Sequence, residues 1–190
     1  LALIKGQEAH RLLTPQVVPQ NFDSYFGLAI ADYKLLEEQF KSYSRHFNIP
    51  LNQINFSSLS VIDEIGWLQL KEQKTIILHL NHTETIPVQL FSEGQAKGSY
   101  RGIKLYDHQL PKDFELFLQQ LGSYENLKWV CKLDDFLIYS DTETRLKQLI
   151  GNYLDNATLT NNLEFKTLRD ELADNSTFLL FGQTQNLKNI

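Results

Sequence analysis

The clearest pattern of apolar and polar positions lies between residues 126 and 154. Apolar side chains first occupy alternate positions, namely Leu127, Trp129, Cys131 and Leu133. This period of two is typical of a β-strand with one buried face. Asp134 and Asp135 interrupt the run with residues that tolerate turns, and residues 136–139 are β-branched or aromatic. The pattern therefore predicts a β-hairpin.

A helix is expected directly after this hairpin. Ser140 is placed to act as the N-cap, and Glu143 three residues later completes a capping box. Apolar residues then follow the helical period at Leu146, Leu149, Ile150, Tyr153 and Leu154. Gly151 weakens the last turns without abolishing the pattern.

Similar patterns predict the other elements. Strands are expected at 22–30, 61–70, 75–80, 86–91, 100–106 and 176–181, and helices at 33–47, 113–121 and 163–172. Gly27 marks a point of close approach within its strand, and Asp32 is placed to cap the helix after it. The helix at 163–172 is expected to bury Leu163, Leu168 and Leu172.

The order of these elements predicts an α+β fold with a mainly antiparallel sheet and helices packed on one face. The prolines at 15 and 19 indicate a lead-in or linker over residues 1–18. Two related strand–helix–hairpin modules are expected after it, at 19–98 and 99–190. One continuous domain is the alternative.

Composition narrows the possible functions. The chain has 190 residues, 42% of them hydrophobic, and a formal net charge of −5, which argues against nucleic-acid binding. It contains no stretch that could span a membrane and no signal peptide. Because it begins at Leu1 and contains no methionine, we expect a piece of a longer protein, with any membrane tether upstream. Cys131 is the single cysteine, and we expect it in the core.

Three segments carry a resemblance to a known family. They are residues 136–141, which end in Tyr139-Ser140-Asp141, residues 158–165 and residues 176–181, and residues 19–30 read like the opening strand of such a module. Over about 19–182 the chain resembles domain-of-unknown-function family 3352 of the bacterial envelope and lipoproteins like it in Bacteroidetes. The resemblance implies an extracytoplasmic, membrane-tethered protein of unknown activity. It brings no catalytic motif with it.

Histidines suggest one weak metal candidate. His79 and His82 lie near Glu84, but residues three apart on a strand point to opposite faces, so chelation would require a turn at Asn81. We therefore predict no metal site. The other histidines are scattered and are expected at the surface: His10, His46 and His108.

Four acidic residues form the other chemical candidate: Asp134, Asp135, Asp141 and Glu143. Paired carboxylates can catalyse acid–base steps when one of them is buried, but turn and cap roles explain all four. No glycine-rich phosphate loop or nucleophile motif occurs. Six aromatic residues could line a ligand groove, although helical spacing favours a core: Tyr25, Phe26, Tyr33, Phe40, Tyr43 and Phe47.

These observations predict a non-enzymatic extracytoplasmic domain that binds a protein partner or has a structural role, with no assigned catalytic, cofactor or metal residues. One alternative is a domain that binds a small ligand or carbohydrate. Another is a hydrolase that uses Asp134, Asp135 and Asp141.

Overall fold

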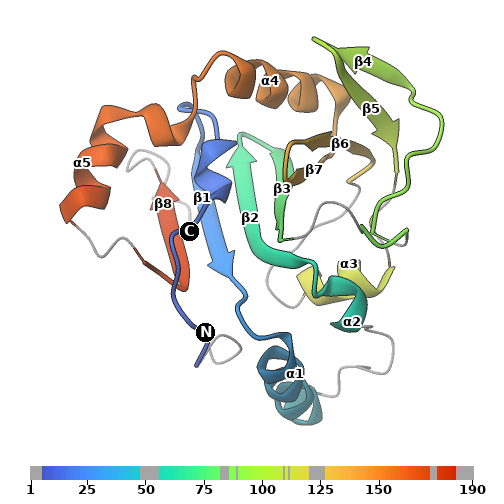
Figure 1. Cartoon of the computed structure of the whole chain (residues 1–190), viewed down its shortest axis with the longest axis vertical. Helices are drawn as coiled ribbons and strands as arrows, with labels where there is room; N and C mark the ends of the chain where they lie inside the picture. The colour runs from blue at the N-terminus through green and yellow to red at the C-terminus, as the bar shows by residue number, and fades with distance from the viewer. Residues whose placement is uncertain are drawn as a thin grey trace.

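The computed structural model describes residues 6–47, 56–81, 86–88, 90–108, 110, 112–119, 127–171 and 175–182. Its centre is an eight-stranded sheet in the order β4-β5-β6-β7-β3-β2-β1-β8, and every pairing between neighbouring strands is antiparallel (Figure 1). The strands are β1 (Ser24–Ala29), β2 (Ile62–Leu70), β3 (Gln73–Leu80), β4 (Gly98–Tyr100), β5 (Ile103–Asp107), β6 (Trp129–Leu133), β7 (Phe136–Ser140) and β8 (Phe178–Gly182).

Helices complete the fold. They are α1 (Tyr33–Phe47), α2 (Phe56–Leu59), α3 (Lys112–Gln119), α4 (Glu143–Leu154) and α5 (Leu163–Glu171), with short 3₁₀ helices η2 (Thr14–Gln16) and η4 (Leu159–Asn161). The predicted α+β class and antiparallel sheet are confirmed. None of the helices in the described part of the chain is both long and apolar enough to cross a membrane.

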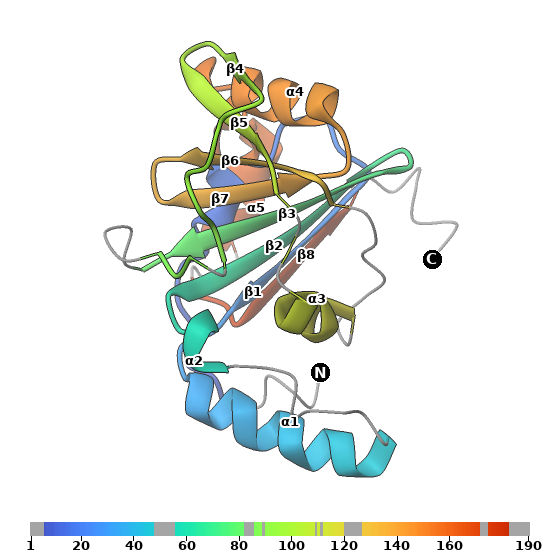
Figure 2. The ribbon, with the colours of Figure 1, turned by 90° about the vertical axis from the view of Figure 1, so that its right-hand side faces the viewer.

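Helices cover both faces of the sheet, so the prediction of helices on one face is wrong (Figure 2). Successive residues of β3 show this, because Ile76 and Leu78 belong to the core under α1 and α3, whereas Ile77 belongs to the core under α4. Every residue of β7 is buried. The sequences of central strands that are covered on both faces are continuous apolar runs. A search for alternating apolar and polar residues does not show that both faces of such a strand are buried.

The two expected modules share this one sheet. The hairpin β2–β3 pairs with β7 through β3, and β8 returns to pair with β1. The repeat is not confirmed. The expected lead-in also contributes to the core, because Leu12, Val17 and Val18 are fully or almost fully buried.

Two strand predictions are corrected. Residues 100–106 do not form one strand, because Arg101 and Gly102 have positive φ angles and turn the chain between β4 and β5. In the described residues of 86–91, the amides of Leu90 and Phe91 both donate to the carbonyl of Pro87, which makes a turn. Glycine adopts positive φ angles more readily than other residues do, so Gly102 is the residue from which the turn between β4 and β5 could have been predicted.

The predicted hairpin β6–β7 is confirmed, with Asp134 at the turn in the left-handed region (φ 48°). The expected cap is corrected. Ser140 is the last residue of β7, and Thr142 is the N-cap of α4, its hydroxyl accepting from the Arg145 amide. Glu143 begins the helix and pairs with Lys147.

The apolar residues predicted to be buried are confirmed in α1 and β1 but not in α5. Tyr25 and Phe40 are fully buried, and the Phe40 and Phe117 rings lie 5.2 Å apart, so these aromatics belong to the core. In α5, however, Leu163 is 77% exposed, and Phe165 is the buried residue. The side chains of Tyr43 and Phe47, and residues Leu121 and Leu172, lie outside the described residues.

Candidate functional site

Of the candidate metal-binding group, the structure describes His79 alone. His79 Nδ1 lies 2.6 Å from a carboxylate oxygen of Asp63, and the ring of His79 packs against Phe136. His82, Glu84 and the His46 side chain lie outside the described residues. Within the part of the chain that is described, no group of three or more His, Cys, Asp or Glu side chains could hold a metal ion.

Two other histidines, expected at the surface, are partly exposed and also make specific contacts. His10 Nε2 lies 3.2 Å from the buried carboxylate of Glu64. His108 packs its ring against Phe91, and its Nε2 atom is buried. Both histidines contact residues that are distant in sequence, which a scan for local motifs does not detect.

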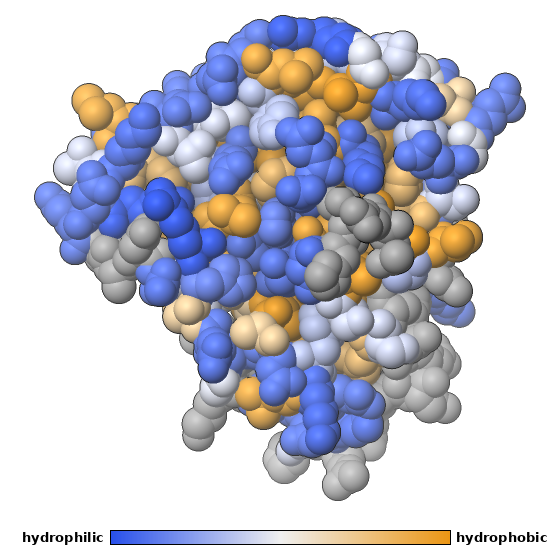
Figure 3. Space-filling view, viewed as in Figure 1, coloured by the Kyte–Doolittle hydropathy of each residue, from blue (hydrophilic) through white to orange (hydrophobic). Residues whose placement is uncertain are grey.

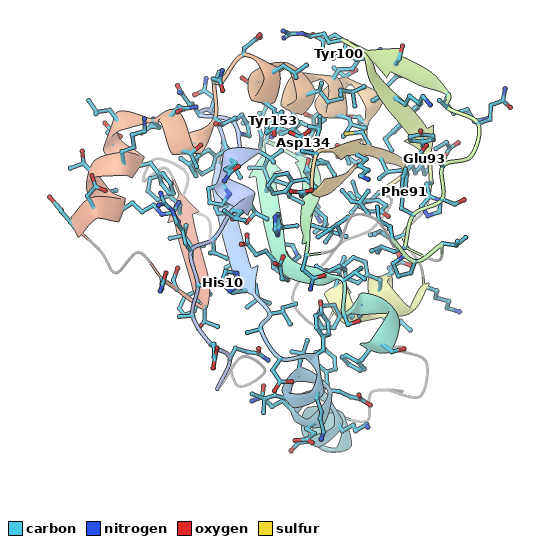
Figure 4. The ribbon with its side chains drawn as sticks, in the orientation of Figure 1. His10, Phe91, Glu93, Tyr100, Asp134 and Tyr153 are labelled. Carbon is cyan, nitrogen blue, oxygen red and sulfur yellow. The ribbon has the colours of Figure 1, made fainter. Side chains whose placement is uncertain are left out.

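The acidic residues do not converge. Asp135 and Asp141 flank the five-residue strand β7 at opposite ends, which places their backbones about 20 Å apart. Glycosidase carboxyl pairs lie roughly 5–9 Å apart, so Asp135 and Asp141 do not form a pair of that kind. Asp141 accepts from the Lys74 amide at 3.2 Å, whereas Asp134 accepts from the phenol of Tyr153 at 2.5 Å (Figure 4).

A pocket of about 690 Å³ lies between the N-terminal segment 11–16, the end of α4, η4 and α5. Hydrophilic residues cover most of the side of the molecule seen in Figure 3, with smaller apolar patches between them. Arg11 and Arg169 are the charged lining residues, and Leu12, Leu13 and Leu154 are apolar. The neutral polar lining residues are Gln16, Tyr153, Asn156, Thr158, Thr160 and Asn161.

The sheet beneath the N-terminal segment carries two glycines directly opposite each other, Gly27 and Gly66. The Tyr25 ring lies over both of them, because a Cβ atom built on Gly27 would lie 2.4 Å from the Tyr25 phenol oxygen, and one built on Gly66 would lie 3.2 Å from the ring. The same phenol is hydrogen-bonded to the Thr14 hydroxyl at 2.6 Å. The predicted close approach at Gly27 is therefore confirmed. It lets the Tyr25 phenol reach Thr14 and hold the N-terminal segment against the sheet.

A buried carboxylate holds the same segment. Glu64 on β2 accepts from the backbone amides of Leu13 at 2.7 Å and Thr14 at 2.8 Å, and His10 lies at its other oxygen. The Glu64 residue is fully buried. A buried charge is stable only when donors surround it, so this carboxylate fixes the backbone of one pocket wall.

The opposite wall is held by long-range contacts. Arg169 of α5 donates from Nη2 to the Leu12 carbonyl at 3.3 Å, and its guanidinium lies 5.6 Å from the centre of the Phe165 ring. Burial raises the pKa of Tyr25 far above its ordinary value, and the hydrogen bond to Thr14 and, to a smaller degree, the positive charge of Arg169 oppose this rise only in part. The buried phenol therefore remains protonated beneath the pocket.

The chain between α4 and α5 forms the remaining wall. The Leu159 amide donates to the Val18 carbonyl at 2.7 Å, which joins η4 to the N-terminal segment. Asn156 has a positive φ angle of 55°, and its carbonyl accepts from the side-chain amide of Asn161 at 2.9 Å. These contacts fix the backbone of this wall.

The pocket lining is rich in hydrogen-bonding groups. Arginine, amide and hydroxyl groups supply hydrogen-bond donors and acceptors, and the described lining residues include no carboxylate, imidazole or thiol. Sequence reasoning missed these residues because no motif joins them. A polar run between two predicted helices was the available signal, and it does not distinguish a pocket from an ordinary loop.

One charged core residue was also missed. Arg145 is only 2% exposed, and its Nε and Nη2 atoms have no hydrogen-bond partner among the described residues. Burial lowers the pKa of Arg145, and the charges of Asp141 and Asp23 oppose that fall. The residue lies in the first turns of α4, outside the pocket lining.

No family model, curated protein or solved structure matches the chain. The resemblance to family 3352 therefore stays a prediction.

Proposed function

We propose that the chain is a non-enzymatic binding domain that holds a small polar ligand in the pocket beside its N-terminal segment. The supporting observation is the pocket lining, which joins fixed donors and acceptors with three leucines and, among the described residues, has no carboxylate, imidazole or thiol. Concave sites with a few positioned polar groups are the usual binding sites of small molecules. An extracytoplasmic location, expected from the family resemblance, remains part of this proposal.

Protein-partner binding is the second candidate, and it rests on β8. This strand is the last of the described sheet, and its Phe178 and Leu180 side chains are 44% and 60% exposed. Edge strands present unpaired backbone groups that can accept another strand. The hydrolase alternative has weaker support, because Asp134 and Asp135 are exposed and Asp141 lies at the far end of β7.

The first test is a search for ligands by thermal shift, with sugars, sugar acids, nucleotides and amino acids as probes. A ligand that binds only the folded state raises stability by about 2.7 kcal/mol at a hundred times its Kd. The blocking variant is Gln16→Trp, because Gln16 is exposed and its side chain lines the pocket. The matched control is Gln95→Trp, an exposed glutamine before β4 that does not line the pocket.

We expect a stabilising ligand for the natural chain and for Gln95→Trp, with the shift lost in Gln16→Trp. If a ligand stabilises both tryptophan variants equally, its site lies elsewhere and the proposal is wrong. Turnover of the bound ligand into product would contradict the non-enzymatic part.

A further inference from the structure

We propose that strand β8 is the contact surface of a homodimer, in which the β8 strands of two copies pair antiparallel and continue the sheet from one copy into the other. The second copy is then the partner in the second candidate function, and the contact does not depend on the pocket. β8 is the last strand of the described sheet, and its register with β1 is regular, without a bulge. Figure 1 shows β8 at the outer edge of the sheet, with α5 beside it. Such an edge offers backbone groups to another strand.

The hydrogen bonds of the segment before β8 show which backbone groups of the strand point away from the sheet. The Ala29 amide of β1 donates to the Thr177 carbonyl at 2.8 Å, whereas the Ser176 amide donates away from β1, to the His10 carbonyl at 3.0 Å. Successive residues of a strand alternate in this respect. The backbone groups of the even-numbered residues of β8 therefore point outward, and no strand of the described chain pairs with that side.

A two-fold axis through Leu180 pairs these outward residues with one another. Leu180 then lies opposite Leu180 of the second copy, and Phe178 lies opposite Gly182, so the outward backbone groups of both strands meet in hydrogen-bonded pairs. Phe178 and Leu180 are 44% and 60% exposed in the single chain, and their side chains are on the same face of the sheet. Because Gly182 has no side chain, the Phe178 ring of the other copy has room to lie over it. The sequence of β8 is therefore complementary to itself.

The distribution of charge also favours this contact. The formal net charge of −5 makes two copies repel each other, but residues 175–182 contain no charged residue and no proline. Edge strands that stay unpaired are usually very short or carry lysine or proline. The edge at the other end of the sheet fits that description, because β4 has three residues and lies between Lys97 and Arg101. β8 is longer and has neither lysine nor proline.

Helix α5 extends the apolar surface on the other face of the sheet. Its Phe165 ring lies 5.4 Å from the ring of Phe181, whose side chain is on the face opposite to that of Phe178. A two-fold axis perpendicular to the sheet keeps each face continuous, so the α5 helices of both copies lie on the same side of the junction. Four of the six exposed large apolar residues of the described chain belong to β8 and α5, and those of α5 are Leu163 and Leu168. A pair of five-residue strands alone is smaller than the interfaces of stable dimers, and these leucines enlarge it.

The test is sedimentation velocity of the whole chain over a range of protein concentrations. We expect a reversible equilibrium between monomer and dimer, because the interface is small. Leu180→Lys should weaken the dimer about tenfold, since it places two like charges opposite each other on the axis. The matched control is Val88→Lys, which adds the same charge at a residue that is 70% exposed and lies outside β8 and α5. It should leave the dimer unchanged.

Cysteine substitutions test the register of the two strands. Hydrogen-bonded residues of an antiparallel pair have Cα atoms about 5.5 Å apart, and disulfides join Cα atoms roughly 4.4–6.8 Å apart. Leu180→Cys should therefore form a disulfide between the two copies on oxidation. Phe178→Cys is the control, because four residues of strand, about 14 Å, separate it from its counterpart. The natural Cys131 does not compete, since it is buried.

Three results would overturn the inference. A dimer that Leu180→Lys leaves unchanged uses another surface, and a dimer that Leu180→Cys does not cross-link has another arrangement. A chain that is monomeric at every concentration forms no such dimer. Hydrogen exchange of the Leu180 amide then shows what covers β8: slow exchange indicates a segment of the same chain, and fast exchange indicates an edge left open for a different protein. None of these results bears on the pocket, which the thermal-shift search tests separately.

Discussion

The phenol of Tyr153 donates a hydrogen bond of 2.5 Å to the carboxylate of Asp134, which ties the last turn of α4 to the β6–β7 turn. Burial, followed by the contact with Asp134, raises the pKa of Tyr153 to about 12, so the phenol stays a donor at ordinary pH. We expect Tyr153→Phe to lower the free energy of unfolding by about 1 kcal/mol, or less because Asp134 is exposed. Urea denaturation at two pH values between 6 and 9 should give the same loss.

Tyr100→Phe is the control for this prediction. The Tyr100 phenol makes no hydrogen bond in the described part of the chain, although its ring lies near Gly151 of α4, the helix that contains Tyr153. Removing that hydroxyl should leave stability almost unchanged. Equal effects of the two substitutions would show that the Asp134 contact contributes nothing.

Glu64→Gln should destabilise the chain by about 2 kcal/mol, because the buried amides of Leu13 and Thr14 would lose a charged acceptor. The change should also weaken ligand binding, since these residues carry one wall of the pocket. Urea denaturation measures the first effect and calorimetry the second. Glu72→Gln, at the exposed β2–β3 turn, should alter neither. A stable Glu64→Gln variant would mean that the N-terminal segment is held mainly by apolar contacts.

Gly27→Ala should cost about 2 kcal/mol or more, because the new Cβ would lie 2.4 Å from the Tyr25 phenol oxygen and 3.1 Å from a Leu12 methyl group. Relief of that contact would displace the phenol from Thr14. Gly94→Ala is the control, since no atom of the described residues lies within 4 Å of its Cβ position. It should be neutral or stabilising by up to about 1 kcal/mol. Thermal unfolding of both variants distinguishes a specific contact from a general intolerance of alanine.

His79 should make stability depend on pH. Burial alone lowers the pKa of His79, but the Asp63 hydrogen bond and the charges of Asp63, Glu64 and Asp135 outweigh it, so the folded-state pKa lies above the ordinary 6.5. Protonated His79 therefore stabilises the folded state fully below pH 6.5, and this contribution is lost as the pH rises through the folded-state pKa.

The measurement is the free energy of unfolding at several pH values from 5.5 to 8.5, with Asp63→Asn as the comparison. The natural chain should lose more stability over this range than the variant does, because Asp63 supplies the hydrogen bond to the imidazole. Parallel curves for the two proteins would contradict the prediction. An NMR titration of His79 checks the pKa directly.

Local pattern identified much of the fold. The β2–β3 and β6–β7 hairpins and helix α4 follow from alternation, turn residues and helical period, because each depends on residues close in sequence. The N-cap of α4 is Thr142 and not the predicted Ser140. Both residue types can cap a helix, but β7 extends through Ser140, so the cap comes later in the chain. The burial of Cys131 was predicted and is confirmed, with burial raising the pKa of its thiol.

The pocket could not be predicted in the same way. Its walls join Leu12 to Arg169, 157 positions apart, and Leu13 to Glu64, 51 positions apart. Hydrophobic period shows that a face is buried but not what covers it. The apolar period of α5 likewise did not show which residue is buried. Phe165 packs against Phe181, while Leu163, which the helical period placed on the buried face, is exposed.

The sequence by itself determined the class of fold, most strands and helices, and the close approach at Gly27, because these depend on side-chain shape and local hydrogen bonding. Only the tertiary structure decided that helices cover both faces, that Leu12, Val17 and Val18 pack into the core, and that two arginines distant in sequence line one pocket. Those outcomes depend on contacts between distant segments, whose free energy comes from mutual burial and is not encoded in any one stretch of the chain.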